Sequence, residues 1–228
     1  MTLRMVQFFQ IWSKEWGLSA FLVLLVVTVF IIAPIVHLGI AGRPLISVFF
    51  SFLLISGVAA VSEKRALTAL VTGLVAVNIG LRWMEHLTSS PAVELASAVS
   101  SIVSLGSLVV VVLIQTLYKG PITWHRIQGA IAVYLLLGLI WSYAYHVILI
   151  QNPGSFQPAT LGEQRDSVMP DLVYFSFVTM TTVGYGDFTP VHPMARSLAM
   201  LEALVGQLYP AILIGRLVAM ELQYRESR

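Results

Sequence analysis

The sequence predicts an all-α integral membrane protein with six transmembrane helices, plus a short re-entrant helix that is followed by a loop. Three observations favour this fold class. Hydrophobic residues form 57% of the 228 residues, charged residues form only 11%, and the mean hydropathy is +0.86, far above that of ordinary soluble domains. Six apolar runs approach the roughly 20 helical residues that a bilayer core requires. A seventh, shorter apolar run ends in a glycine-containing loop.

The six predicted spans differ little in composition. Five of them contain no Lys, Arg, Asp or Glu, and these are Leu18–Val36, Pro44–Val61, Ala66–Leu81, Leu95–Tyr118 and Ile127–Ile150. The sixth, Ser197–Gly215, is apolar apart from Glu202. The shorter run, Leu172–Thr182, has eleven residues and cannot cross a bilayer as a helix. We therefore expect this run to enter the membrane and turn back.

The basic residues predict the orientation of the chain. With six spans, both termini lie on one side, and that side carries nine of the thirteen Lys and Arg residues. The opposite side carries the other four, which are Arg43, Arg82, Arg165 and Arg196. The positive-inside rule then predicts that both termini are cytoplasmic and that the re-entrant run enters from the outer side. The compact chain favours a multi-pass protein of the plasma membrane.

Composition also excludes several classes of function. The chain has no cysteine, so disulfides and thiolate metal sites are excluded. Its basic residues are scattered through loops and form no patch that would follow the phosphates of a nucleic acid. The spans hold no nucleophile with a matching base and no pair of aspartates, so we expect no enzyme and no cofactor.

The loop after the short run reads "TTVGYGD", Thr181 to Asp187. Gly184 and Gly186 can adopt left-handed conformations that Val183 and Tyr185 avoid, so that successive carbonyl oxygens face one line. Four copies around an axis would give rings of carbonyl oxygens that replace the hydration shell of K⁺, and the Thr182 hydroxyl would add a further ring. A re-entrant loop that merely holds helices together is the alternative.

The run before this loop, "PDLVYFSFVTM", is typical of a short helix. Pro170 suits the first helical turn, and Asp171 suits the positive end of the helix dipole. The negative end would then point toward the centre of the membrane, where it favours a cation.

The "TTVGYGD" stretch, together with the order of outer helix, pore helix, loop and inner helix, resembles the potassium channel family. This resemblance implies that Thr182, Val183, Gly184 and Tyr185 bind K⁺, that Gly186 completes the selectivity filter, and that Asp187 lies at its outer mouth. It also implies a homotetramer of this chain with three further copies of itself in the lipid bilayer, and a gating hinge at Gly206, beside the helix-bending Pro210. In many relatives a tryptophan of the pore helix holds the outer aspartate, whereas here the aromatic residues are Tyr174, which can donate a hydrogen bond, and Phe175, which cannot.

The resemblance also suggests a domain layout. We expect a cytoplasmic or interfacial segment at 1–17, a four-helix voltage-sensor-like domain at 18–118, a linker at 119–126, a pore domain at 127–222 and a cytoplasmic tail at 223–228. Voltage sensors carry several arginines in the fourth segment, but this one has none, and its small residues suit close packing. We therefore expect a potassium-selective channel with weak or absent voltage dependence. The alternatives are a non-conducting or regulatory channel-like subunit and a potassium-uptake transporter subunit.

Three further polar positions have open roles. Glu202 needs a partner within the membrane, such as Arg196 or a hydroxyl at Thr179 or Thr181, or else it is protonated. His146, near the outer end of the fifth span, is an interface residue or a sensor of external pH. Glu85 and His86 are adjacent and point in different directions on a helix, which makes a metal site there a weak interpretation.

Overall fold

The computed structural model describes residues 17–37, 43–60, 65–88, 90–117, 123–157 and 168–226. The expected N-terminal segment at 1–17 therefore lies outside the described residues except for its last residue. Residues 119–122 of the expected linker and the last two residues of the tail also lie outside them.

The described chain is mostly helical, as predicted. The first apolar helix covers Gly17–Val36 and includes a π-helical turn, η1 (Thr28–Ile32), before α2 (Ala33–His37). The long helices are α3 (Arg43–Ala60), α4 (Arg65–Leu87), α5 (Pro91–Thr116), α6 (Trp124–Gln151) and α8 (Pro193–Glu226), and the short helix α7 is Met169–Met180. Two short strands, β1 (Phe156–Gln157) and β2 (Thr189–Pro190), pair antiparallel.

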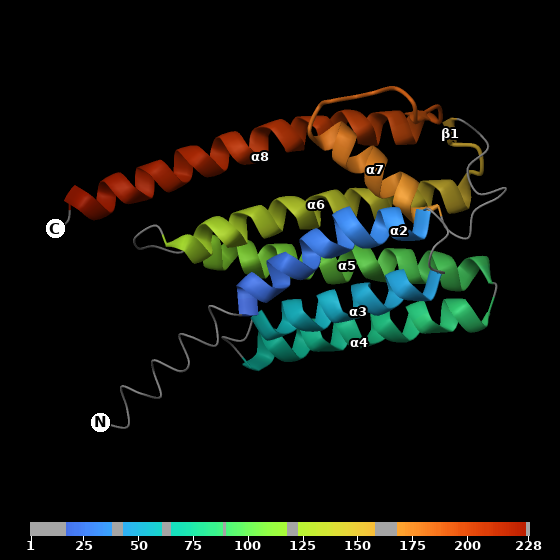
Figure 1. Ribbon diagram of the computed structural model, residues 1–228, viewed down its shortest axis with the longest axis horizontal. Coiled ribbons are helices and arrows are strands. Elements are labelled where there is room, and N and C mark those ends of the chain that lie inside the picture. Colours follow the sequence, from blue (N-terminus) through green and yellow to red (C-terminus); the bar gives the residue numbers. More distant parts are fainter. Residues whose placement is uncertain are drawn as a thin grey trace.

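These helices form a bundle with one outlying member. α3, α4, α5 and α6 run alongside one another, and the inclined α7 lies between α6 and α8 (Figure 1). The C-terminal part of α8 extends away from the other helices (Figure 1). α7 is thereby packed between α6 and the first half of α8.

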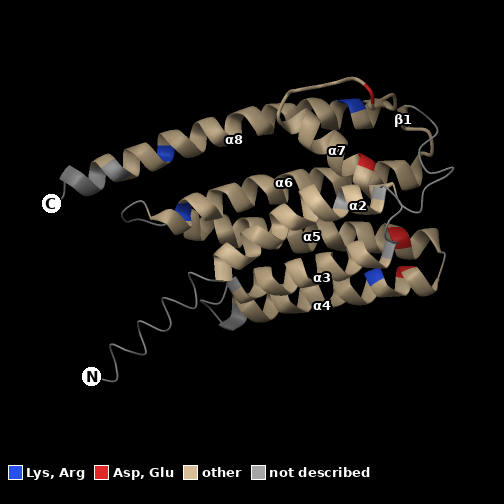
Figure 2. Cartoon of the chain, viewed as in Figure 1, with Lys and Arg blue, Asp and Glu red and all other residues tan. Residues whose placement is uncertain are grey.

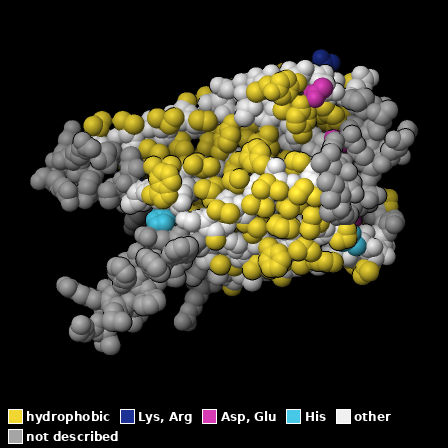
Figure 3. All heavy atoms as spheres, viewed as in Figure 1, with side chains coloured by type: hydrophobic (Ala, Val, Ile, Leu, Met, Phe, Trp, Pro, Cys, Tyr) yellow, Lys and Arg dark blue, Asp and Glu magenta, His cyan; other side chains and the backbone are white. Residues whose placement is uncertain are grey.

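Several helices have the length and composition of membrane spans. Among the described residues, five are long and apolar enough to cross: Gly17–Val36, Leu67–Leu87, Pro91–Thr116, Trp124–Gln151 and Pro193–Met220. The apolar part of α3, Pro44–Ala59, is shorter. Charged residues are absent from the central stretches of α3, α5 and α6 (Figure 2), and hydrophobic side chains cover the visible face of the bundle (Figure 3). The chain is a multi-pass membrane protein.

The third span predicted from the sequence, Ala66–Leu81, is shorter than the helix in the structure. α4 continues to Leu87, so Arg82 lies inside the helix and is 7% exposed, whereas the sequence placed it in an outer loop. Its guanidinium lies 4.1 Å from the centre of the Phe50 ring and donates hydrogen bonds to the Tyr143 and Ser101 hydroxyls. These contacts satisfy one terminal nitrogen and one face of the guanidinium, which helps the arginine to lie buried within α4.

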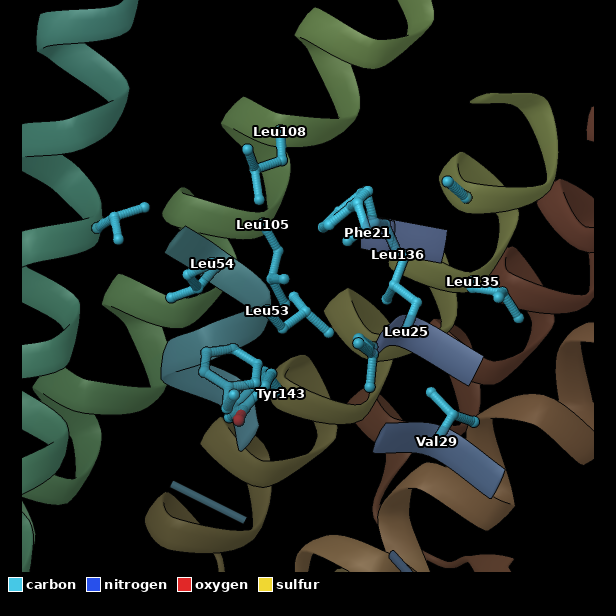
Figure 4. Close-up of a cluster of buried hydrophobic side chains, with 14 of the residues drawn as sticks. Phe21, Leu25, Val29, Leu53, Leu54, Leu105, Leu108, Leu135, Leu136 and Tyr143 are labelled. Atoms are coloured by element: carbon cyan, nitrogen blue, oxygen red, sulfur yellow. The ribbon is translucent and has the colours of Figure 1, made fainter. Parts of the chain in front are cut away.

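The main core joins the first helix to the rest of the bundle. Phe21 and Leu25 pack among leucines of α3, α5 and α6, with Leu53, Leu105 and Leu136 fully buried (Figure 4). Because lipid is as apolar as these side chains, close van der Waals packing stabilises the cluster rather than release of water.

α5 packs through small residues, as predicted from the sequence. Its inward face buries Ser97, Ala98, Ser101 and Ser104, and α5 lies against both α4 and α6. At its C-terminal end, Thr116 lies so close to Gly129 of α6 that a Cβ at residue 129 would collide with the threonine hydroxyl. Small side chains at such positions let helix backbones approach closely.

Candidate ion-conduction site

α7 is the short helix that the sequence predicted before the glycine-containing loop. Its twelve residues, Met169–Met180, give a rise of about 18 Å against a bilayer core of about 30 Å. Pro170 lies in the first turn together with Asp171, as expected for the positive end of the helix dipole. The helix is therefore too short to cross the membrane, and the loop begins where it ends.

The loop Thr182–Gly186, called here the filter loop, has an alternating backbone. Gly184 has φ 56° and Gly186 has φ 78°, so both predicted left-handed glycines are confirmed. Thr182 also has a positive φ of 59°, which the sequence did not indicate. Such a φ is unfavourable for a residue with a Cβ, so surrounding contacts must hold Thr182 in place.

Backbone hydrogen bonds show which way the first carbonyl groups point. The amides of Val183 and Gly184 both donate to the Val178 carbonyl oxygen, at 3.0 and 3.3 Å. In a trans peptide the carbonyl of the preceding residue points opposite to the amide. The carbonyl oxygens of Thr182 and Val183 therefore both point away from α7, on one side of the loop.

The outer end of the filter loop is fastened by Tyr174. Its hydroxyl donates to Asp187 Oδ2 at 2.7 Å, and Asp187 Oδ1 accepts the Phe188 amide at 3.0 Å. Tyr174 thus makes the hydrogen bond that its phenol allows. This bond raises the pKa of the Tyr174 phenol to about 12, so the phenol remains a donor at neutral pH.

Phe175 has a different role. Its ring centre lies 5.0 Å from Tyr145, 5.5 Å from Phe156 and 5.3 Å from Phe188. These rings form a second buried cluster beneath the β1–β2 pair, in which Phe156 is paired with Pro190. Edge-to-face aromatic contacts of this kind fix α7 relative to the segments on either side of it.

α8 contacts α7 and the filter loop at successive levels. Glu202 is fully buried and contacts Ser176 of α7. Four residues later, Gly206 lies against the backbone of Met180, and a Cβ there would collide with the Met180 carbonyl oxygen. Gln207 Nε2 then donates to the Thr182 hydroxyl at 3.1 Å. The predicted hinge at Gly206 is therefore also a point of close helix contact, and α8 continues through Pro210 without a break.

The partners of Glu202 differ from those named on sequence grounds. Its Oε2 accepts from the Tyr145 hydroxyl and its Oε1 contacts the Ser176 hydroxyl, both at 2.5 Å. Arg196 and the hydroxyls of Thr179 and Thr181 are not its partners. The expectation of a hydroxyl on the pore helix was right in kind but wrong in position, because Ser176 lies one turn earlier on the face toward α8.

The remaining polar positions are also placed. His146 Nε2 lies 3.1 Å from Glu94 Oε1, which joins α6 to α5. His86 Nε2 lies 2.8 Å from the Ser47 hydroxyl, which joins α4 to α3. No group of three or more His, Cys, Asp or Glu residues suited to a metal ion occurs within the described ranges.

The filter loop is exposed in the single chain. Val183 is 52% and Tyr185 71% exposed, although the Ser176, Glu202 and Tyr145 side chains behind them are buried. The arrangement is an exposed loop whose first two backbone carbonyl oxygens point away from α7, which is itself held by packed side chains. Oxygens arranged in this way can coordinate a dehydrated cation.

Comparison with known proteins agrees with this geometry. Residues 130–222 match the model of a family described as "Ion channel". The resemblance to the potassium channel family is confirmed for this part of the chain.

The similar proteins include Protein LctB of Bacillus caldotenax, 34% identical over 87 residues that cover 37% of this chain and 64% of the relative. The inward rectifier potassium channel Kirbac3.1 of Paramagnetospirillum magnetotacticum is 36% identical over 84 residues, 35% of this chain and 24% of the relative. Potassium voltage-gated channel subfamily A member 5 of Mustela putorius furo is 36% identical over 84 residues, 36% of this chain and 14% of the relative.

This chain thus spans less than two thirds of the length of each of these relatives. No solved structure matches it significantly. The matched family is one of ion channels, and the match covers the part of the chain that holds α7 and the filter loop.

Proposed function

We propose that the chain is the subunit of a homotetrameric, potassium-selective channel in the plasma membrane, with both termini cytoplasmic, six spans and passive conduction. K⁺ would be coordinated by Thr182, Val183, Gly184 and Tyr185, with Gly186 completing the filter and Asp187 at its outer mouth. The observation that carries the proposal is the alternating positive φ of Thr182, Gly184 and Gly186. Four exposed filter loops facing one axis would bury one another and form rings of oxygens.

The test is K⁺ flux into liposomes that contain only the purified protein, with Na⁺ flux measured in parallel. Gly184→Ala should abolish the K⁺ flux, because a left-handed alanine costs about 1–2 kcal/mol in each subunit and disturbs the carbonyl row. Gly154→Ala is a matched control, because Gly154 also has a positive φ, 90°, and open space around it but lies outside the filter loop. Equal K⁺ and Na⁺ flux through the unaltered protein would contradict the proposal, and absence of flux from a stable tetramer would favour a non-conducting subunit.

We further propose that conduction depends weakly or not at all on voltage. Moving one charge across the membrane field is worth about 2.3 kcal/mol per 100 mV, and α5 contributes no Lys or Arg. Arg82, the buried arginine of α4, is held by Tyr143 and Phe50. The conductance–voltage curve of the purified protein, without a blocking ion, should be shallow. A steep curve would show that a charge elsewhere moves through the field.

A further inference from the structure

Glu202, Tyr145 and Ser176 form a buried group that we call the carboxyl cluster. It joins three helices, since Tyr145 belongs to α6, Ser176 to α7 and Glu202 to α8. The Glu202 and Ser176 side chains are fully buried. Within the described part of the chain, no Lys, Arg or His nitrogen forms an ion pair with the Glu202 carboxyl. The carboxyl is thus surrounded by hydroxyl groups.

Counting hydrogens decides the protonation state of this carboxyl. The cluster contains three contacts: Tyr145 to Glu202 Oε2 at 2.5 Å, Ser176 to Glu202 Oε1 at 2.5 Å, and Ser176 to the Gly138 carbonyl oxygen at 2.7 Å. Each contact needs one hydrogen, and the two hydroxyls supply only two. The Gly138 carbonyl can only accept, so Ser176 donates to it, and the hydrogen between Ser176 and Glu202 must come from Glu202.

The surroundings favour the same assignment. A carboxylate buried without a cation is strongly unfavourable, whereas a neutral acid with a donor and an acceptor on its two oxygens is satisfied. The titratable groups that face Glu202 are Tyr145 and, farther off, Tyr134, both of α6. α7 presents the neutral Ser176 hydroxyl.

The carboxyl cluster holds the helix that leads into the filter loop. Ser176 lies on α7, six residues before Thr182, the first residue of the filter loop. Further toward the C-terminus of α8 come the close approach of Gly206 to Met180 and the hydrogen bond of Gln207 to Thr182. Loss of the carboxyl contacts would release α7 from α6 and α8 more than one turn before the filter loop starts.

We propose that Glu202 is a positioning residue, held as a neutral carboxylic acid, that fixes α7 between α6 and α8 and so maintains the ion-selecting conformation of the filter loop. This inference rests on the proposed function of the loop. It adds a residue on the inner helix, away from the ion path, on which selectivity depends.

The protonation state is tested without any ion flux. Infrared spectra of the full chain in lipid nanodiscs at neutral pH should contain a carboxylic acid C=O band that Glu202→Gln removes. Tyr145→Phe should shift this band, because Glu202 Oε2 loses the hydrogen bond from the tyrosine hydroxyl. Absence of the band from the difference spectrum would overturn the proposal even if the protein conducts K⁺.

The positioning role is tested by the ratio of K⁺ to Na⁺ flux. Raising the pH from neutral to mildly alkaline, below the range in which tyrosines ionise, should lower this ratio about tenfold, the equivalent of one lost hydrogen bond. Glu202→Gln keeps an amide donor for Ser176 and an acceptor for Tyr145, so its ratio should stay high and independent of pH.

Tyr143→Phe is the matched control. It also removes a tyrosine hydroxyl from α6, but one that faces Arg82 and not Glu202. Tyr145→Phe and Ser176→Ala should lower the flux ratio several-fold, and Tyr143→Phe should not. An alkaline loss of selectivity that persists in Glu202→Gln, or equal effects of the two tyrosine variants, would overturn the positioning role. Failure of the proposed function looks different, because the infrared band would remain while no variant passed K⁺ selectively.

Discussion

Two buried tyrosines of α6, two residues apart, serve two polar clusters with opposite chemistry. Tyr143 accepts a hydrogen bond from Arg82, and Tyr145 donates one to Glu202. Because successive residues of a helix are about 100° apart, positions 143 and 145 point to nearly opposite sides of α6. α6 therefore separates two clusters. The arginine cluster, formed by Arg82, Asn78, Ser101 and Tyr143, lies on the side of α4 and α5, and the carboxyl cluster lies on the side of α7 and α8.

The two clusters differ in how completely their hydrogen bonds are satisfied. In the arginine cluster, Arg82 Nε and Asn78 Oδ1 are buried and have no hydrogen-bond partner within the described residues. Asn78 and Arg82 share the Ser101 hydroxyl. In the carboxyl cluster, both oxygens of Glu202 are used. An arginine cannot release its charge, whereas a carboxyl can gain a proton, so only the second cluster can adapt to burial by becoming neutral.

The largest expected effect is that of Arg82→Ala on stability. The variant loses two hydrogen bonds from a charged donor and the contact with the Phe50 ring, which should lower the free energy of unfolding by about 3 kcal/mol. Arg82→Met keeps the length of the side chain and should cost only about 1 kcal/mol, because apolar replacements of buried charges are often tolerated. Thermal unfolding in detergent measures the stability of both variants. Equal stability of Arg82→Ala and the unaltered chain would show that the Arg82 contacts do not stabilise the fold.

A smaller effect should follow from Gly206→Ala, on the carboxyl side. The added Cβ meets the Met180 backbone, which cannot move aside easily, so we expect a loss of about 2 kcal/mol. Gly215→Ala is the control, because nothing lies within 4 Å of that position and alanine favours a helix by about 1 kcal/mol. If Gly206 serves only as a flexible hinge, both variants should raise the unfolding temperature alike.

The smallest expected effect is the difference in stability between the Phe variants of Tyr143 and Tyr145. Tyr143→Phe leaves a charged donor with one partner fewer and should cost about 2 kcal/mol, whereas Tyr145→Phe removes a bond between neutral groups and should cost about 1 kcal/mol. Thermal unfolding of the two variants, side by side at neutral pH, measures this difference. The order would reverse if Glu202 were ionised, because the lost bond would then be the charge-assisted one.

Much of the architecture could be predicted because it depends on local composition. Apolar runs without charges specify membrane helices wherever the bilayer is the solvent, and the twelve residues of α7 are too few to cross. The positive φ values at Gly184 and Gly186 were predictable because only glycine adopts them readily. The positive φ of Thr182 was not, since it depends on the bonds of the neighbouring amides to Val178.

The supports of the candidate site were largely hidden in the sequence. Glu202 was recognisable as a group that needs a partner, but Ser176 and Tyr145 are 26 and 57 residues away, and nothing distinguishes their hydroxyls from others in the chain. Arg82 resembled the flank of an apolar run. Its burial depends on Phe50 and Tyr143, which reach it from two other helices.

The contrast between the exposed filter loop and its buried supports bears on biogenesis. Tyr145, Ser176 and Glu202 meet within one chain, so these contacts need no second subunit. Val183 and Tyr185 have more than half of their surface uncovered in the single subunit. Their final order in the proposed tetramer therefore depends on subunit concentration, as for any surface completed by association. Dilution would loosen the ion path first and leave each subunit's interior intact.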